Sequence, residues 1–132
     1  GMCKGPKDMD EFEMMYGTLE DQSDDETSIY NYFKKAIKLR HSYPVIARGK
    51  MALYDGFDNA NPDTVSVFTR NMADNSYEPL LIVINTSEND VSQKLGEDYT
   101  KLESFLVTGD KEVTIKYGMI NIPSFGIAIL TR

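Results

Sequence analysis

Tryptophan is absent from the 132 residues, and cysteine and histidine occur once each. A single cysteine, Cys3, cannot form an internal disulfide, so the redox compartment stays open. One cysteine and one distant histidine do not make a zinc site, which needs clustered ligands. A Ser-His-Asp or Cys-His catalytic site would have to use His41, whose place near the end of an expected helix better suits a partner of the helix dipole.

Long apolar runs and an excess of positive charge are missing as well. No stretch approaches the roughly 20 apolar residues that cross a bilayer. Asp and Glu number 21 against 14 Lys and Arg, which gives a net charge of −7. An acidic surface repels phosphate backbones and anionic headgroups, and the glycines form no phosphate-binding loop. We therefore expect neither nucleic acid nor a membrane as a partner. With no phosphate-binding loop and no ligand cluster, we also expect no cofactor and no metal.

Residues 1–27 are unlike a domain, because they carry many charges and no strand pattern. We expect a partly disordered loop or linker here. Residues 21–26 read DQSDDE. A cation site is one interpretation of this acidic run, and a solvated loop is the favoured one. The first residues lack the basic and apolar regions of a signal peptide, and the compartment stays unknown.

The sequence of residues 28–48 predicts one helix and the segment that follows it. Over residues 28–42 the apolar side chains recur at spacings of about three and four, which places them along one face. Thr27 or Ser28 can cap the start, and Pro44 ends the helix. Such a face must be buried, either on the domain that follows or on a body outside this chain. The face consists of Ile29, Tyr32, Phe33, Ala36, Leu39 and Tyr43.

From residue 49 onward the apolar pattern takes a period of two, and turn signals recur with no helix between them. Residues 80–86, LLIVINT, are apolar on both faces, which predicts a strand in the middle of a sheet. We expect residues 49–132 to form a mainly β domain, an antiparallel β-sandwich of about seven or eight strands with Greek-key-like connections, preceded by one α-helix. The candidate strands are residues 51–55, 64–70, 80–86, 91–95, 105–108, 112–117, 119–122 and 126–131.

Two short motifs allow a functional and a plainer interpretation. Asn59, Asn61 and Asp63 alternate like the oxygen ligands of a calcium loop, but the required glycine and closing glutamate are absent, so a hairpin connection is favoured. Asn85 opens the glycosylation sequon Asn-Thr-Ser, which also arises by chance at the end of a strand.

Carbohydrate binding is the one activity that a bare sandwich could offer, since sugars stack on exposed aromatic rings. Tryptophan, the most useful stacking ring, is missing. Tyrosine in a small sandwich is more often half-buried packing than a sugar platform. The candidates near predicted loops and strand ends are Tyr54, Phe57, Tyr77, Tyr99 and Tyr117.

Five motifs in order resemble the end of α-amylase-family enzymes (glycoside hydrolase family 13). The first is a tyrosine- and lysine-rich helix followed by Tyr43-Pro44, and the others are four strand or turn signatures. The order and spacing carry the resemblance, because each motif is weak alone. The matches are SIYNYFKKAIKLR at residues 28–40, VFTR at 67–70, IVINTS at 82–87, LVTGD at 106–110 and IPSFGIAIL at 122–130.

The resemblance implies that the helix is the last one of a (β/α)8 barrel and that a C-terminal sandwich follows it. The apolar positions of the helix spread over more than one narrow stripe, so the helix would then lie between the barrel and the sandwich, with the residues named above as the interface. The family's catalytic carboxylates, roughly 5 Å apart, lie on barrel strands upstream. No catalytic residue carries over to this chain, and a calcium ion, if any, would belong to the catalytic domain.

The resemblance also implies a parent enzyme that acts on α-glucans or α-glucosides, with this chain as a non-catalytic accessory domain that stabilises the barrel. The alternatives are an autonomous carbohydrate-binding module and an interaction domain with no sugar role. The partners expected are the barrel of the same polypeptide and an α-glucan. If the helix face is bare, a homodimer induced by truncation is a further expectation.

Overall fold

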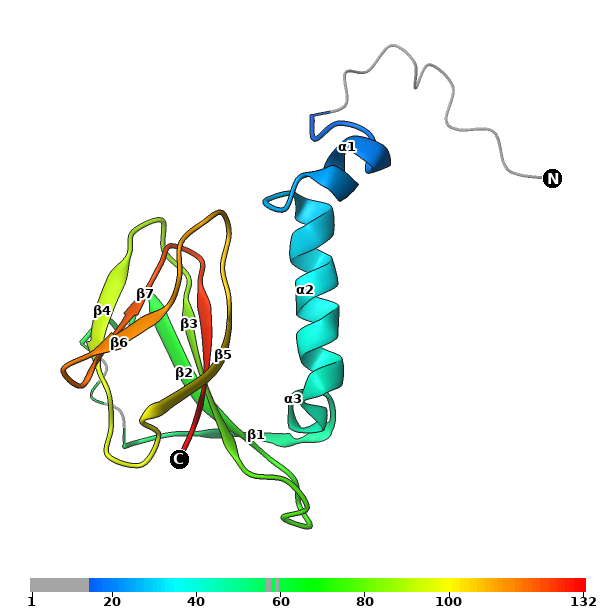
Figure 1. Ribbon diagram of the computed structural model, residues 1–132. Coiled ribbons are helices and arrows are strands. Elements are labelled where there is room, and N and C mark those ends of the chain that lie inside the picture. The colour runs from blue at the N-terminus through cyan, green and yellow to red at the C-terminus, as the bar shows by residue number, and fades with distance from the viewer. Residues whose placement is uncertain (1–14, 57, 59) are drawn as a thin grey trace.

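A computed structural model describes residues 15–56, 58 and 60–132 (Figure 1). In this part of the chain, short helices come first and strands follow. The helices are α1 (Leu19–Asp24), α2 (Ile29–Ser42) and α3 (Pro44–Arg48). The strands are β1 (Lys50–Leu53), β2 (Val65–Asn71), β3 (Leu80–Asn85), β4 (Val91–Lys94), β5 (Lys101–Leu106), β6 (Thr114–Lys116), β7 (Met119–Ile122) and β8 (Ile127–Thr131).

The strands form two antiparallel sheets that face each other, which confirms the predicted β-sandwich. One sheet has the order β1-β2-β3-β8-β5, and the other has the order β4-β7-β6. The chain passes between the sheets after β3, β4, β5 and β7 (Figure 1). The first sheet therefore holds both the start and the end of the domain.

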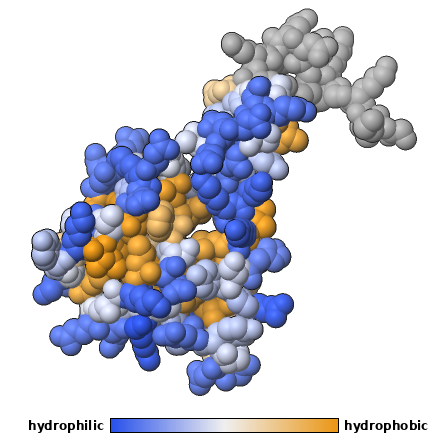
Figure 2. All heavy atoms as spheres, in the orientation of Figure 1, coloured by the Kyte–Doolittle hydropathy of each residue, from blue (hydrophilic) through white to orange (hydrophobic). Residues whose placement is uncertain are grey.

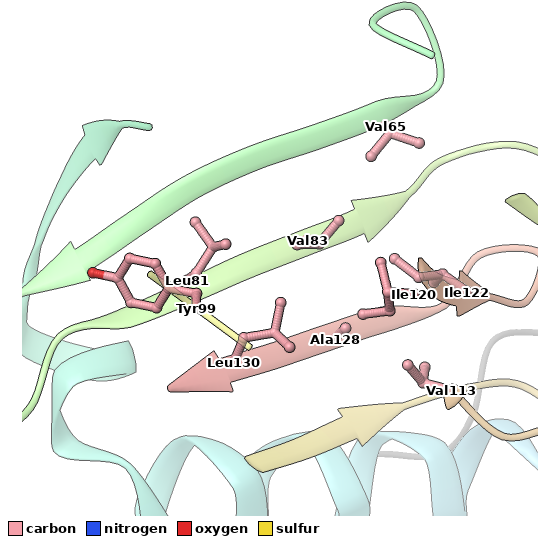
Figure 3. Packing of buried hydrophobic residues seen from close by; sticks show 9 residues of the cluster. All are labelled: Val65, Leu81, Val83, Tyr99, Val113, Ile120, Ile122, Ala128 and Leu130. Carbon is pink, nitrogen blue, oxygen red and sulfur yellow. The ribbon is translucent and has the colours of Figure 1, made fainter. Parts of the chain in front are cut away.

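Strand β3 lies in the middle of the five-stranded sheet, as its two-sided apolar run predicts. Antiparallel ladders join it to β2 and to β8, with Val83 opposite Val67 and Ala128. The side chains on one face of β3 and β8 meet the smaller sheet in the main core, which Figure 3 shows. That core holds Val65, Leu81, Val83, Tyr99, Val113, Ile120, Ile122, Ala128 and Leu130.

Asn85, at the end of β3, links the two sheets. Its side-chain amide donates to the carbonyl oxygens of Asn89 at 2.7 Å, Ile122 at 3.2 Å and Pro123 at 2.9 Å. Its Oδ1 accepts from the backbone N–H of Ser87 at 3.0 Å. The side chain is 1% exposed, so the sequon at this position is a structural motif and offers no accessible amide for a glycan.

The predicted strands agree with the structure apart from their ends, and β5 differs most. It runs over Lys101–Leu106, whereas the sequence pattern places it at residues 105–108. The register of β5 against β8 shifts between Leu102 and Ser104. Such a bulge interrupts the alternation of polar and apolar residues, so a period-two pattern misses the first half of the strand.

The helical region is richer than the single helix expected. Residues 1–27 are not wholly loop, because α1 forms there with a capping box in which Thr18 and Asp21 bond each other's backbone N–H groups. This corrects the interpretation of the acidic run as a plain loop. Pro44 does end α2, but it also begins α3, since a first-turn residue needs no N–H.

Candidate functional site

The sandwich covers only part of the surface of helix α2. It stands beside the sheets and meets them mainly at its C-terminal end (Figure 1). Its 14 residues include none that is fully buried. An amphipathic helix normally buries its apolar face, so the exposure of each side of α2 shows where a neighbour is missing among the described residues.

The face of α2 that is turned to the sandwich is half-buried and consists of Tyr32, Ala36 and Leu39, continued by Tyr43. Leu39 and Tyr43 pack against a small second core of Val45, Leu80 and Ile129. Burial raises the pKa of the Tyr43 hydroxyl, and the neighbouring Glu103 carboxylate raises that pKa further. The hydroxyl therefore stays protonated at neutral pH and donates to Glu103 Oε1 at 3.2 Å.

Arg70 of β2 fixes α3, and with it the end of α2, to the sandwich. Its Nη2 donates to the carbonyl oxygen of Ile46 at 2.8 Å, and its Nε donates to that of Val45 at 3.4 Å. The Val45 carbonyl also accepts from the Gly49 N–H at 2.9 Å, so the guanidinium adds a second donor there and supplies a donor to the Ile46 carbonyl near the end of the short helix. This bond gives a physical reason for an arginine at the end of the VFTR motif.

Gly49 lies at the same junction, between α3 and β1. A Cβ at this position would lie 2.6 Å from the carbonyl oxygen of Val45 and 3.1 Å from that of Asn71. Both atoms are backbone, so neither can move aside cheaply. Only glycine allows the chain to leave α3 and enter β1 this closely.

A second face of α2 carries large apolar side chains that the described residues leave open. Phe33 is 60% exposed, Ile37 56%, Ile29 43% and Tyr30 39%. We call these four residues the exposed stripe. At 3.6 residues per turn it lies roughly a third of a turn from the half-buried face. In Figure 2 the visible side of α2 is hydrophilic, and hydrophobic surface appears at its right-hand edge, away from the sandwich.

The sequence-predicted interface set is therefore split. Ile29 and Phe33 belong to the exposed stripe, whereas Tyr32, Ala36, Leu39 and Tyr43 belong to the half-buried face, so the six do not form one face. Tyr30 and Ile37 were missed. The spacing of four between Ile29, Phe33 and Ile37 is the sequence signal that could have separated the two faces.

Strand β1 adds a second exposed apolar surface. Leu53 is 85% exposed and Met51 is 64% exposed. Leu53 lies opposite Phe68, Phe68 opposite Ile82, and Ile82 opposite Ile129 of the small second core. Met51 and Leu53 thus extend the sheet face on which α3 packs, rather than the face turned to the smaller sheet.

The five candidate sugar-stacking rings do not gather at one place. Tyr99 is 3% exposed and packs in the main core, which corrects the expectation of an open ring at that position. Tyr54 is half-buried and meets Tyr99 edge to face, with ring centroids 5.2 Å apart. Tyr77, in the β2–β3 loop, and Tyr117, in the β6–β7 turn, are exposed but lie at different ends of the domain (Figure 1). Phe57 lies outside the described residues.

The titratable groups have structural rather than catalytic surroundings. Hydrogen bonds from Thr18 lower the pKa of Asp21, and hydrogen bonds from Thr27 lower that of Asp25. Ser76 lowers the pKa of Asp74 in the same way, and Lys111 with Ser124 lowers that of Asp90. A glycosidase acid needs a raised carboxyl pKa, whereas these shifts are downward.

The described residues offer no metal cluster and no membrane-spanning helix. Among residues 15–56, 58 and 60–132, no group of three or more His, Cys, Asp and Glu side chains is placed to hold a metal ion. Asn59 of the possible calcium loop lies outside the described residues, and the carbonyl oxygen of Asn61 accepts from the Val65 N–H at 2.8 Å in the β1–β2 connection. No helix in the described part of the chain is long and apolar enough to cross a bilayer.

Comparison with solved structures finds the same fold. Eubacterium rectale Amy13B superposes with a TM-score of 0.79 and 32% identity, over 98% of this chain and 25% of that one. The α-amylase from H. orenii superposes with a TM-score of 0.65 over 86% of this chain and 22% of that one, and its 24% identity supports the fold alone.

Comparison with curated sequences gives a shorter match. An oligo-1,6-glucosidase from Heyndrickxia coagulans is 40% identical over 77 residues, which are 57% of this chain and 12% of that protein. No protein-family model matches the chain. The chain thus spans about a quarter or less of the length of these relatives.

Proposed function

We propose that this chain, whose sequence and fold resemble the C-terminal part of α-amylase-family enzymes (glycoside hydrolase family 13), is a non-catalytic accessory piece of such an enzyme. In this proposal α2 is the last helix of a (β/α)8 barrel, and the sandwich is the domain that follows it. The parent enzyme acts on α-glucans or α-glucosides. The role of the piece is to complete and stabilise the barrel.

The exposed stripe is the observation that carries the proposal. Helix α2 has one apolar face on the sandwich and a second, holding Phe33 and Ile37, that the described residues leave open. A helix that belongs only to the sandwich has no use for a second apolar face. The last helix of a barrel needs both faces, because barrel strands pack on one and the next domain on the other.

The energy at stake is large for one helix. Full burial of a large aliphatic or aromatic side chain is worth about 1.5–3 kcal/mol. Burial of the exposed stripe on a barrel therefore supplies several kcal/mol, which is comparable to the roughly 5–15 kcal/mol that stabilise a whole domain. The joint made by Arg70 and Gly49 transmits this contact to the sandwich, so docking of the helix also fixes the domain.

The catalytic chemistry of the parent belongs, in this proposal, to the barrel. The family's acid and nucleophile stand at the ends of barrel strands, and a structural calcium ion, where one exists, belongs there too. The alternative, an autonomous carbohydrate-binding module, accounts for exposed tyrosines such as Tyr77 but gives no reason for the exposed stripe.

The test is complementation. The part of Eubacterium rectale Amy13B that this chain does not match, here called the barrel piece, is purified and assayed for hydrolysis of a chromogenic maltooligosaccharide. We expect the chain alone to give no turnover and its addition to raise the activity and melting temperature of the barrel piece. Turnover by the rigorously purified chain alone contradicts the proposal.

A matched pair of variants shows whether the exposed stripe is the contact. Phe33→Glu places a charge in the stripe and is expected to abolish complementation. Tyr117→Glu adds the same charge to a fully exposed turn of the sandwich and should leave complementation unchanged. Equal loss in both variants would mean that charge alone, and not the stripe, governs the association.

A further inference from the structure

A pocket of about 330 Å³ lies where the C-terminal end of α2 and the start of α3 meet the β2–β3 loop, β5 and β8. Its volume lies at the lower end of the roughly 300–1,000 Å³ typical of small-molecule sites. Val45 and Leu80 give it an apolar floor. Tyr77, Glu78, Lys101, Glu103 and Thr131 supply ring and polar groups around that floor.

Thr131 is the first sign that the pocket is built for a ligand. The residue is 6% exposed, and its Oγ1 has no hydrogen-bond partner among the residues that the structure describes. Its neighbour Leu130 points into the main core, so the alternation along β8 turns Thr131 to the other face, where it lines the pocket. A buried hydroxyl without a partner is costly, and a bound hydroxyl group would satisfy it.

The aromatic and charged groups favour a neutral, hydroxyl-rich molecule. The Tyr77 ring is 48% exposed and can stack. Glu103 accepts from the Tyr43 hydroxyl at 3.2 Å through Oε1 and lies 3.5 Å from Lys101 Nζ through Oε2. Carboxylates accept hydrogen bonds from hydroxyl groups, and the lysine ammonium group donates hydrogen bonds to hydroxyl oxygens. Two glutamates against one lysine disfavour an anion, and the lysine disfavours a polycation.

We propose that this pocket binds a small neutral saccharide, with a sugar ring against Tyr77 and hydroxyl groups bonded to Thr131, Glu78 and Glu103. The choice of an α-glucoside as that saccharide rests on the proposed function. The pocket lies at the joint between the helices and the sandwich, so a bound sugar strengthens the contact that Arg70 and Tyr43 already make there.

A second hollow of about 440 Å³ serves as an internal control. It lies on the smaller sheet, beside Asp90 and Lys111, and no aromatic side chain lines it in the described part of the chain. Volume alone would favour this hollow over the Tyr77 pocket. Stacking predicts the opposite preference for a sugar.

The experiment is a chemical-shift titration of the isotope-labelled full chain with maltose and, separately, isomaltose. We expect saturable shifts at residues around Tyr77, Lys101 and Thr131, with a dissociation constant on the order of millimolar for so small a ligand. Tyr77→Ala should weaken binding about fivefold or more, and Tyr117→Ala, an exposed tyrosine outside the pocket, should leave it unchanged.

Thr131→Val separates binding from folding. Valine keeps the shape and removes a hydroxyl that has no partner within the described structure, so the melting temperature should hold or rise while sugar affinity falls severalfold. The absence of saturable shifts, or shifts that Tyr77→Ala does not change, overturns the proposal. Shifts with spermidine but not with sugar also overturn it, since they identify a cation pocket.

The two proposals fail separately. If the barrel piece associates and sugars do not bind, only the pocket proposal is lost. If sugars bind at Tyr77 and the barrel piece does not associate, the proposed function is lost and the chain is better described as a carbohydrate-binding module.

Discussion

Strand β3 and helix α2 are both rich in large apolar residues, and the structure treats them in opposite ways. In β3, Leu81 and Val83 are wholly buried between the sheets, and Leu80 on the other face is covered by α3. In α2 no residue is fully buried, and Phe33 and Ile37 are more than half exposed. Among the described residues, both faces of β3 are therefore covered, whereas α2 is covered on one side only.

This contrast points to the exposed stripe as the surface on which the proposed barrel would pack. Scattered exposed apolar residues are normal on a protein surface, but a stripe at helical spacing marks an interaction site. The same sequence strategy, apolar residues on two faces, produces a central strand in β3 because neighbours lie on both sides. In α2 it leaves one apolar face without a covering neighbour among the described residues.

Truncation of one buried side chain in β3 and one exposed side chain in α2 should have very different effects on stability. Leu81→Ala removes a side chain that is 0% exposed and should lower the free energy of unfolding by about 2–5 kcal/mol. Ile37→Ala, its counterpart in the exposed stripe, should change it by no more than about 0.5 kcal/mol in the isolated chain. Urea unfolding of both variants measures the difference. Similar losses in both would mean that the stripe is already buried in solution.

Asn85→Ala should cost about 2–3 kcal/mol, because buried carbonyl groups lose their donors. The affected groups are the carbonyls of Asn89, Ile122 and Pro123, at one end of the sandwich. Thermal unfolding measures the loss, and the control is Thr86→Ala, which removes one exposed hydrogen bond to the Thr64 carbonyl oxygen and should cost less. A neutral result for Asn85→Ala would show that the bonds of Asn85 do not hold the sheets together.

Arg70→Met should lower stability by about 1–2 kcal/mol, and the loss should be confined to α3 and the end of α2. The methionine keeps much of the apolar stem but gives up the bonds to the carbonyls of Val45 and Ile46. Amide hydrogen exchange should quicken in α3 and at the C-terminal end of α2 while β3 and β8 stay protected. Faster exchange across β3 as well would mean that helix and sandwich unfold as one unit.

Asp90→Asn should give the smallest effect, and one that depends on pH. A hydrogen bond from Lys111 and a second from the Ser124 N–H hold the pKa of Asp90 below its usual 3.8. The carboxylate therefore stabilises the fold above that usual value, and the contribution is lost as the pH falls through the lowered one. Wild type and variant should differ slightly at neutral pH and converge in acid, where thermal melts check the trend. A difference that grows in acid contradicts this linkage.

The sequence predicted the sandwich well because period-two alternation and frequent turns are local signals. It placed Leu80 and its neighbours at the centre of a sheet because that run is apolar on both faces. It missed the start of β5, since a bulge hides the alternation, and α3, since Pro44 was read only as a stop. It predicted that the apolar positions of α2 spread over more than one narrow stripe, but it did not assign them to two sides, because apolar spacing alone does not say which side the sandwich will cover.

The candidate sugar residues were harder to predict than the fold. Tyr99 and Tyr77 are the same amino acid near similar turn signals, yet one is in the core and the other lines a pocket. Thr131 gave no sequence signal at all, since a threonine near the end of a strand is ordinary. Its significance depends on a hydroxyl left without a partner in the described structure, which only three-dimensional packing reveals.

Hydrogen exchange of α2 with and without the barrel piece shows whether the barrel covers the exposed stripe. We expect amides around Phe33 and Ile37 to exchange more slowly when the barrel piece is added, and amides of β3 and β8 to keep their exchange rates. Phe33→Glu should remove the protection, and dilution of the chain alone distinguishes a barrel contact from pairing of two copies through the same stripe. Unchanged exchange in α2 at saturating barrel piece, or protection that persists in Phe33→Glu, would contradict the claim that the exposed stripe is a barrel interface.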